Sequence, residues 1–457
     1  MDPYQEIENL KKENAELRAI NQELMSRIEY LEERLSRYET PKNSRNSSLP
    51  PSHDIAKPKR TKSLRKPSTK NPGGQEGHEG KTLQMTSTPD EVVKHIPQYC
   101  TCCGKDLSSV IPELTEQRQR VEIPPVQPIY IEHQIYSRKC ECGNLVTGEF
   151  PSGVTPGISY GEDIESMAAY FSARQFVPFK RMGELFKNVF NLCISDGAIF
   201  KALERITKKA LPAYELIRQK AEKSKVNGGD ETGTKINNDK GWFWTIQGRL
   251  FTFIIASLNR GTKTLTDNFP KGFMFSVMVH DCWKSYFKIL CLAHQICVAH
   301  LLRELNYFIE CYDLQWAKNL KQLLLDAMDF KKTLIPEDYQ QKQLRLRTEY
   351  ENQLSKLLIE PIESKYEKVI SFQARLTKYR KHIFTFLYHR EVPPDNNASE
   401  RAIRNLKVKH KISGYFKSFA GAESFAVLRS IIDTAIKNGI NPLYSLRQIA
   451  AVHIQGE

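Results

Sequence analysis

Three acidic residues stand far apart in the sequence, in contexts that suit phosphate chemistry. Asp230 lies at the start of a β-rich stretch, Asp281 follows an apolar strand pattern directly, and Glu400 heads a strongly basic segment. Carboxylates from two strands and a helix are what two hard divalent cations need for phosphoryl transfer. The sequence therefore predicts that Asp230, Asp281 and Glu400 form a catalytic site that binds Mg²⁺ or Mn²⁺. Each acid alone is more often a helix cap or a surface charge.

The residues that follow Glu400 supply the opposite charge. They predict contacts with DNA phosphates from four side chains, Arg401, Arg404, Lys407 and Lys409. Two alternatives remain open at this stage. Glu400 could simply neutralise part of a DNA-binding helix, and Lys407 and Lys409 could lie on a plain solvated face.

The elements that must position these acids follow from residue patterns. Stretches 241–249 and 250–258 are rich in β-branched and aromatic residues and predict hairpin-connected strands. The stretch FSVMVHDCWKSYF predicts a buried strand that ends at His280, which places Asp281 at the carboxyl edge of a sheet. Asp395 or Asn396 is expected to cap the helix of Glu400. Glu231 is a second choice for the first acid, since it would face the other side of an extended strand.

The region between Asp281 and Glu400 is far longer than a sheet connection needs, and its patterns predict a helical insertion over about 305–390. At its start, CLAHQICVAHLLREL places Cys and His at three-residue steps. On a helix such ligands would line one stripe rather than surround an ion, so packing or support of the site is preferred to zinc. Trp283 and Tyr286 are expected in the core, with base stacking as the alternative.

A cysteine module is predicted over residues 90–150. Cys100 and Cys103 form a C-x-x-C turn ending in Gly104, and Cys140 and Cys142 form a C-x-C turn ending in Gly143. Four thiolates from two such turns predict a closed, structural Zn²⁺ site. Cys102 is a spare ligand that could replace one of the four, and buried or redox-active cysteines are the alternative.

Helices flank the predicted sheet. Three are expected within residues 158–222, the third with Ser195 as its N-cap, and a short turn between them allows either a helix-turn-helix or ordinary helix packing. A further helical segment is expected over residues 431–457. The fold class predicted from all of these elements is multidomain α+β, with a catalytic domain over residues 223–430.

Residues 1–40 carry a heptad pattern that predicts a parallel two-stranded leucine zipper. The inward positions are Ile7, Leu10, Asn14, Leu17, Asn21, Leu24, Ile28, Leu31 and Leu35. The flanking pairs Glu6–Lys11, Glu13–Arg18 and Arg27–Glu32 are all of opposite charge. A homodimer or a higher oligomer is therefore expected, with a helix packed on its own domain as the alternative.

A proline-rich basic linker is expected over residues 41–80, serving either as a phosphate-binding strap or as a spacer. The whole chain of 457 residues has a formal charge of +14, which points to a polyanionic partner. Without a signal-peptide pattern or a long apolar run, the expectation is a cytoplasmic, nucleoid-associated protein with reduced cysteines and no membrane contact.

These motifs together resemble the transposases of insertion sequence 66. The resemblance runs in order through the zipper, KNSRNSSLPPS with GGQEGHEGK, the cysteine module, YGEDIESMAAYFSARQFVPFKRMGELF, DETG, VHDCWKSYF, HQICVAHLLREL and DNNASERAIRNLKVKHKISGYFKS. It implies an RNase H-like catalytic domain whose triad is Asp230 in DETG, Asp281 in VHD and Glu400 in DNNASER. It also implies that Cys297 and His300 support the active site.

The activity implied by the resemblance is cleavage at transposon ends and joining to target DNA, without a covalent enzyme intermediate. The expected partners are terminal inverted repeats, target DNA and small accessory proteins of the same element. Two rival functions remain, a non-catalytic DNA-binding regulator built from the zipper and zinc module, and a nuclease of the same fold that cuts without strand transfer.

Overall fold

A computed structural model describes residues 3–39, 46–47, 83–151, 154, 157–340 and 344–452. The chain divides into two units, Met1–Lys57 with Ile129–Glu457, and Pro58–Pro128. The linker expected over residues 41–80 lies outside the described residues, apart from residues 46 and 47. The side chains of Glu32 and Leu35 in the heptad pattern are also outside them. No described helix is long and apolar enough to cross a membrane.

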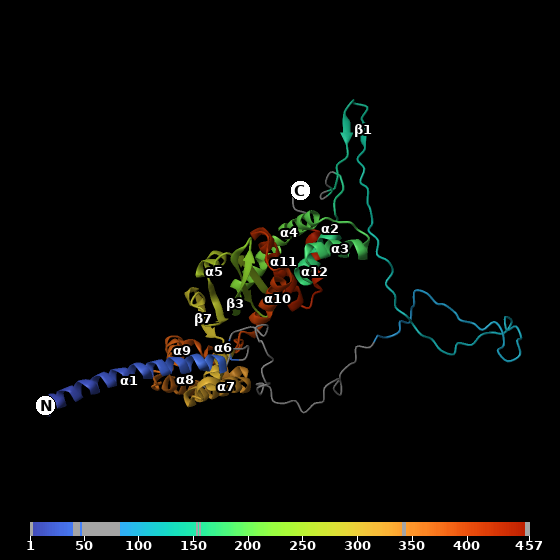
Figure 1. The fold of residues 1–457 in the computed structure, drawn as a ribbon. Helices are drawn as coiled ribbons and strands as arrows, with labels where there is room; N and C mark the ends of the chain where they lie inside the picture. The colour runs from blue at the N-terminus through green and yellow to red at the C-terminus, as the bar shows by residue number, and fades with distance from the viewer. Residues whose placement is uncertain are drawn as a thin grey trace. The chain divides into compact units, whose positions relative to one another are not determined.

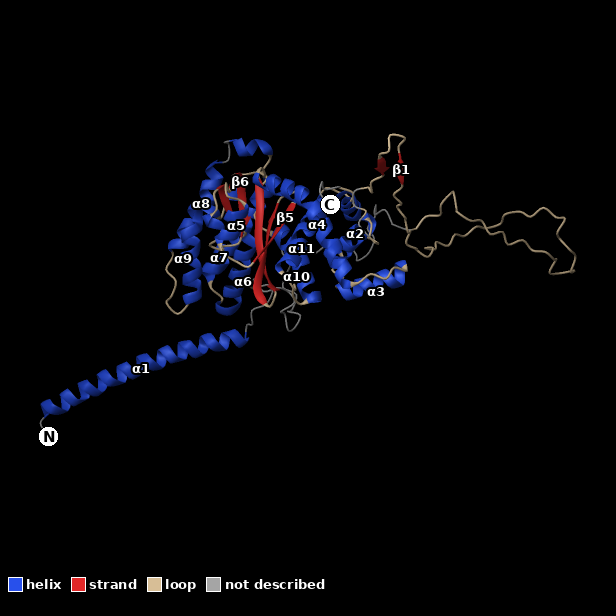
Figure 2. Ribbon diagram, turned by 90° about the horizontal axis from the view of Figure 1, so that it is seen from above, coloured by secondary structure: helices blue, strands red, loops and turns tan. Residues whose placement is uncertain are grey.

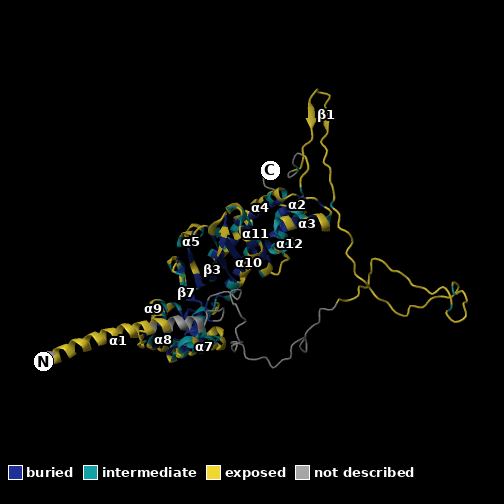
Figure 3. Cartoon of the chain, in the orientation of Figure 1, coloured by how far each residue is buried: buried dark blue, intermediate teal, exposed yellow. Residues whose placement is uncertain are grey.

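The N-terminal segment forms one helix, α1 (Pro3–Glu39), over the predicted heptads. Its apolar stripe is exposed on the single chain, with Leu10, Leu17 and Leu24 retaining 53%, 52% and 52% of their accessible surface. Figure 3 shows this helix as exposed wherever its side chains are described. The helix is present, and its pairing with a second copy stays a prediction.

A mixed five-stranded sheet lies at the centre of the larger unit, in the order β5-β4-β3-β6-β7. It comprises β3 (Val226–Ile236), β4 (Asp239–Gln247), β5 (Thr252–Ser257), β6 (Phe273–His280) and β7 (Cys291–Ile296). Strands β3, β4 and β5 are antiparallel neighbours, whereas β6 and β7 join parallel to β3. Figure 2 shows helices on both sides of this sheet.

The β3–β4 hairpin extends beyond the rest of the sheet. Val226, Asn227 and Gly228 of β3 pair with β6, while the strand pairs with β4 from Gly228 to Ile236. The hairpin turns at Asn237 and Asn238, whose φ angles of 49° and 67° suit a tight two-residue turn. As a result, among the described strands the second half of β3 pairs with β4 alone, and an isolated bridge between Ile236 and Phe416 adds backbone contacts at its end.

Helices that precede, connect and follow the strands lie around the sheet (Figure 1), and one hydrophobic cluster joins them to it. These helices are α2 (Glu162–Ala169), α3 (Phe179–Phe190), α4 (Asp196–Glu222), α5 (Thr262–Asn268), α10 (Asn397–Ser413), α11 (Phe419–Lys437) and α12 (Pro442–Ala450). A π-helical turn at Tyr170–Arg174 continues α2. Tyr214 of α4 stacks on Phe253 of β5 with ring centroids 4.4 Å apart. The region expected over 158–222 therefore shares its core with the sheet.

The helices α3 and α4 are separated by a short turn in which Asn191 is left-handed. Ser195 caps α4 as predicted, because its side chain accepts a hydrogen bond from the Ala198 N–H at 3.2 Å. Ile199, Ala202 and Ile206 on α4 are fully buried. Packing within the core accounts for this helix pair, and a role in the major groove stays a prediction.

A second hydrophobic cluster covers the other face of β6 and β7, through Val277, Val279 and Ile296. It is built from α6 (Val298–Tyr312), α7 (Gln315–Thr333), α8 (Leu344–Ile359) and α9 (Glu367–Tyr379). These helices fill most of the range expected for the helical insertion. Both sheet faces are thus covered, and the carboxyl end of β6 lies beside α6.

Candidate active site

Asp230 lies in the middle of β3, after two glycines that allow close packing. A Cβ on Gly228 would come within 2.4 Å of the Ser399 Oγ, and one on Gly229 within 2.6 Å of the Tyr286 ring. Any larger residue would force these neighbours apart. The glycines therefore let the strand that carries Asp230 approach its neighbours directly.

Asp281 directly follows β6, at the sheet edge predicted from the sequence. The backbone N–H of Trp283 donates a hydrogen bond to its Oδ1 at 2.9 Å. Asp281 also lines a cavity of about 200 Å³. The other lining residues come from the loop after β6 and from β7, α6 and α9, and are Cys282, Trp283, Ile296, His300, Leu301, Glu304 and Arg375.

Glu400 lies in the first turn of α10 (Asn397–Ser413), and Asn396 joins this helix to β3. The Asn396 side-chain amide donates to the Gly229 carbonyl at 2.7 Å, and its oxygen accepts from the Ser399 hydroxyl at 2.6 Å. Its side chain therefore does not cap α10, whereas Asp395 accepts from the Asn397 N–H at 3.0 Å. The start of α10 is thereby anchored one residue from Asp230.

The three acids influence one another electrostatically. The pKa of Asp230 lies well above its usual value because the carboxyl group is buried, and because Glu231, Asp281 and Glu400 place negative charge nearby. Burial also raises the pKa of Asp281, with a further contribution from Glu231. The fold thus brings residues from β3, the end of β6 and α10 into one region of excess negative charge.

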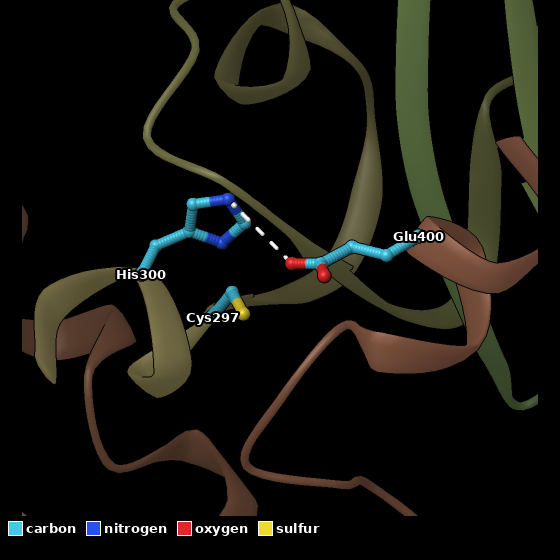
Figure 4. A group of neighbouring side chains, drawn as sticks. All are labelled: Cys297, His300 and Glu400. Atoms are coloured by element: carbon cyan, nitrogen blue, oxygen red, sulfur yellow. Dashed lines mark ion pairs between the residues drawn. The ribbon is translucent and has the colours of Figure 1, made fainter. Parts of the chain in front are cut away.

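A different group contains the closest potential metal ligands among the described residues. The ligand atoms of Cys297, His300 and Glu400 lie within 4.8 Å of one another (Figure 4). The three predicted acids do not form such a group. The Nε2 of His300 lies 3.7 Å from the Glu400 carboxylate. Cys297 is fully buried, and its sulfur accepts from the Asn396 N–H at 3.1 Å.

Arg303, which the sequence reasoning missed, holds both oxygens of Glu400. Its guanidinium lies 3.1 Å from each carboxylate oxygen. Arg303 follows His300 by three residues on α6, so the two side chains share one helix face. That spacing is the sequence signal that could have revealed Arg303. Arg303 and His300 thus both contact Glu400 from α6, whereas the Cys297 sulfur is bonded to the Asn396 N–H.

The stretch CLAHQICVAHLLREL is strand followed by helix, which separates its two Cys–His pairs. Cys291 and His294 belong to β7, where the His294 ring lies 3.2 Å from the Cys291 sulfur and 3.0 Å from His280. Cys297 precedes α6 and His300 lies in its first turn. The expectation of a single helical stripe was therefore wrong, because the chain changes from extended to helical at Cys297.

Glu231 is engaged in structural contacts. Only 2% of its side chain is exposed, and its carboxylate accepts from Arg260 at 3.0 Å and from the Tyr286 hydroxyl at 2.8 Å. Arg260 in turn lies over the Trp283 ring at 3.9 Å and the Trp242 ring at 4.7 Å. Tyr286 is fully buried, as expected of a core residue. Arg260 is a second residue that no sequence motif indicated.

The cations of α10 divide into exposed and buried groups. Arg401, Arg404 and Lys407 are exposed. Lys409 retains only 7% exposure, its amine lies 5.8 Å from the Phe425 ring centre, and burial lowers its pKa to about 8. Lys409 therefore lacks the free amine expected of a phosphate contact, because its position on α10 faces α11.

The two cysteine turns each have the local geometry of a metal knuckle. Gly104 and Gly143 have φ angles of 72° and 88°, the left-handed conformation expected there. The pKa of Cys100 is lowered by the backbone N–H of Cys103 first and of Cys102 next, and that of Cys140 by the N–H of Cys142. Strands β1 (Ser137–Lys139) and β2 (Leu145–Thr147) flank the second turn.

Comparison with known proteins agrees with these features. The family model for "Transposase IS66 family" matches residues 157–424, and that for the "zinc-finger binding domain of transposase IS66" matches residues 97–143. A family of unknown function matches residues 2–84. No curated protein matches the chain. Since the transposase match covers more than half of the 457 residues, the chain belongs to the IS66 family of transposases.

Proposed function

We propose that the chain cleaves DNA at transposon ends and joins the freed ends to target DNA, using Asp230, Asp281 and Glu400. Family membership already makes it a DNA-binding, DNA-processing transposase with a structural zinc domain. The observation that carries the finer proposal is geometric. Strand β3 pairs in parallel with β6, which ends directly before Asp281, and the Asn396 side chain ties the start of α10 to Gly229, next to Asp230. The raised pKa of Asp230, due to burial and to the charges of Glu231, Asp281 and Glu400, agrees with this placement. Acids from three separate elements would together form the site.

The donor set fits magnesium. Carboxylate oxygens are the ligands that hard divalent cations prefer, and the region around Asp230 has excess negative charge that such cations would offset. Asp230, Asp281 and Glu400 would hold them. Bound Mg²⁺ or Mn²⁺ would supply activation of the attacking oxygen and stabilisation of the leaving oxygen in an in-line displacement.

The chain's own residues position this site. The Trp283 N–H orients Asp281, and Asn396 fixes the start of α10 against β3. Arg303 and His300 hold the Glu400 carboxylate. These contacts keep the acids in place before DNA arrives, which lowers the entropic cost of reaching a reactive geometry.

The strand arrangement supports an RNase H-like domain. Its antiparallel β3, β4 and β5 and its parallel β6 and β7 give the order third, second, first, fourth, fifth along the sheet. Asp230 on β3 and Asp281 directly after β6 therefore belong to adjacent strands of the sheet. Exposed Arg401, Arg404 and Lys407 on α10 are proposed to hold DNA phosphates beside them.

The zinc ligands are proposed to be Cys100, Cys103, Cys140 and Cys142. Backbone N–H groups stabilise the thiolates of Cys100 and Cys140, which is the form that binds zinc. Cys102 is the alternative ligand in the first turn. Through the exposed stripe of α1, we also propose a homodimer, the smallest assembly in which these leucines become buried.

The central test uses the purified protein with Mg²⁺, a labelled element end and a target plasmid. We expect Asp281→Asn to reduce cleavage and joining by about 10³-fold or more, since it weakens metal binding at the reacting phosphate. DNA binding should remain. The matched control is Asp267→Asn, which changes an exposed aspartate on α5.

The outcomes separate three functions. Loss of cleavage and joining in Asp281→Asn alone supports the transposase mechanism. Cleavage of end DNA by the unmodified protein without any joined product would favour a nuclease. Asp281→Asn protein with every activity unchanged would favour a DNA-binding regulator and contradict the proposal.

A further inference from the structure

Two lysines face each other near the tip of the β3–β4 hairpin. Lys235 on β3 is directly opposite Lys240 on β4, and both are exposed. Like charges in directly opposite positions destabilise an antiparallel pair. Among the described residues, no carboxylate forms an ion pair with either lysine. A bound anion would remove this repulsion.

A cavity of about 340 Å³ adjoins the same pair. It is lined by Gly233, Thr234, Lys235, Asn238, Lys240 and His410, with no acidic residue among them. The Thr234 hydroxyl lies 3.3 Å from Nδ1 of His410, which joins the hairpin to α10. Two ammonium groups, a hydroxyl, an amide and an imidazole are all groups that hydrogen-bond to phosphate oxygens.

The hairpin is held in place beside α10. Asn396, which precedes α10, bonds to Gly229, while His410 near the helix end contacts Thr234, so helix and strand run in the same direction. Beyond the helix, the Phe416 N–H donates to the Lys235 carbonyl at 2.9 Å. The cavity is therefore built on packed elements rather than on a free loop.

The cavity lies at a distance from the acids that suits a nucleic-acid strand. Glu400 and His410 are ten residues apart on α10, which corresponds to about 15 Å along the axis, or roughly four phosphates of a duplex strand. Exposed Arg404, Lys407 and Lys411 follow Glu400 on the same side of the helix, at spacings of four, seven and eleven residues. A line of cations thus extends from the acids toward the hairpin.

We propose that the cavity between the β3–β4 hairpin and the end of α10 binds a backbone phosphate of the DNA whose cleavage site lies at the acids. The contact is with the phosphate and carries no sequence preference. This inference deepens the proposed function and rests on it for the identity of the bound strand. It gives the hairpin extension a role in aligning DNA along α10.

The test measures how salt weakens DNA binding. A labelled duplex of about 30 base pairs is titrated with protein over a series of KCl concentrations, where each phosphate contact contributes about 0.9 to the slope of log affinity against log salt. We expect Lys235→Ala/Lys240→Ala to lower the slope by about 0.9 or more. The control is Lys263→Ala/Lys271→Ala, which removes equal charge from two exposed lysines elsewhere.

A second measurement needs no variant. Lysine acetylation followed by mass spectrometry should show Lys235 and Lys240 protected by the duplex, and Lys263 and Lys271 unprotected. An unchanged slope, an equal loss in the control, or unprotected Lys235 and Lys240 would overturn the inference. If these results came with normal cleavage by the unmodified protein, only this inference would fail. Absence of cleavage with a changed slope would instead count against the proposed catalytic function.

Discussion

The cysteine module and the sheet region obtain their structure in opposite ways. In the sheet region, large side chains such as Trp244, Phe253 and Phe273 are fully buried. In the described cysteine module, Ile111, Ile123 and others remain more than four-fifths exposed, and its regular structure is limited to short strands and turns. One region has a core of its own, and the other has almost none.

The difference shows where each region finds its stabilising free energy. Burial contributes about 25 cal/mol per Å² of apolar surface, and the sheet with its helices buries many apolar side chains. A module without a core must obtain a comparable contribution elsewhere, and a structural zinc ion supplies roughly 10–16 kcal/mol in small zinc domains. The comparison therefore predicts that metal removal will affect the two regions unequally.

Zinc removal is the strongest way to test this contrast. A zinc chelator should make residues 83–151 sensitive to protease while the thermal unfolding of residues 157–452 stays unchanged, since the sheet region does not depend on the metal. Limited proteolysis with mass spectrometry reports the first effect, and calorimetry the second. Simultaneous unfolding of both regions would show that the contrast is false.

Single cysteine variants sharpen the same prediction. Cys103→Ser should reduce bound zinc, measured by metal analysis, whereas Cys193→Ser should not, since Cys193 is an exposed cysteine outside the module. Retention of zinc by Cys102→Ser would support the proposed ligand set. Loss of zinc from Cys102→Ser would instead show that Cys102 is one of the ligands.

The helix α1 is a third case, because its apolar stripe would be buried only by pairing with a second chain. Leu17→Ala/Leu24→Ala should weaken dimerisation by about 10³-fold or more, because each buried Leu→Ala change costs roughly 2–5 kcal/mol. Alanine preserves helix propensity, so the loss would come from packing. Analytical ultracentrifugation measures it.

Its control is Glu16→Ala/Glu23→Ala, at two exposed helix positions outside the apolar stripe. Equal dimerisation of both variants and the unmodified protein would mean that the stripe serves another purpose. A monomeric unmodified protein would contradict the zipper itself.

Within the packed region, Asn396→Ala should have the smallest effect on folding. It leaves the buried Gly229 carbonyl without its partner, which costs about 1–3 kcal/mol of stability. Cleavage should fall further, on the order of 10²-fold, because a small displacement of α10 moves Glu400 relative to Asp230.

The control is Asn397→Ala at the next position. Thermal unfolding and cleavage rates measured together separate a positioning role from a purely structural one. A cleavage rate for Asn396→Ala equal to that of the control would rule out the positioning role.

Local patterns predicted the elements that depend on short-range chemistry. The alternation before His280, the cap at Ser195, the heptads of residues 1–40 and the glycines of the cysteine turns each act within a few residues. In the structure the alternation forms a strand and Ser195 caps a helix. The heptads form one long helix, and the glycines adopt left-handed turns. The three acids were proposed from the same kind of pattern. Asp281 directly follows β6 and Glu400 lies in the first turn of α10, as expected, whereas Asp230 lies in the middle of β3.

Contacts between distant elements could not be read from these patterns. The packing of strands and helices places Arg303 and Asn396 beside Glu400 and its helix. It likewise places Arg260 beside Glu231. Lys409 was misjudged for the same reason, since its burial depends on α11 rather than on α10. The change from strand to helix at Cys297 likewise depends on packing of β7 in the sheet.

The sequence by itself determined the kinds of chemistry available here: carboxylates for metal, thiolates in glycine turns for zinc, and cations for phosphate. Only the tertiary structure decided which of these groups share a site, because charge and hydrogen-bond energies depend on distances across the fold. The negative charges around Asp230, the support of Glu400 and the facing lysines of the hairpin all arise at that level.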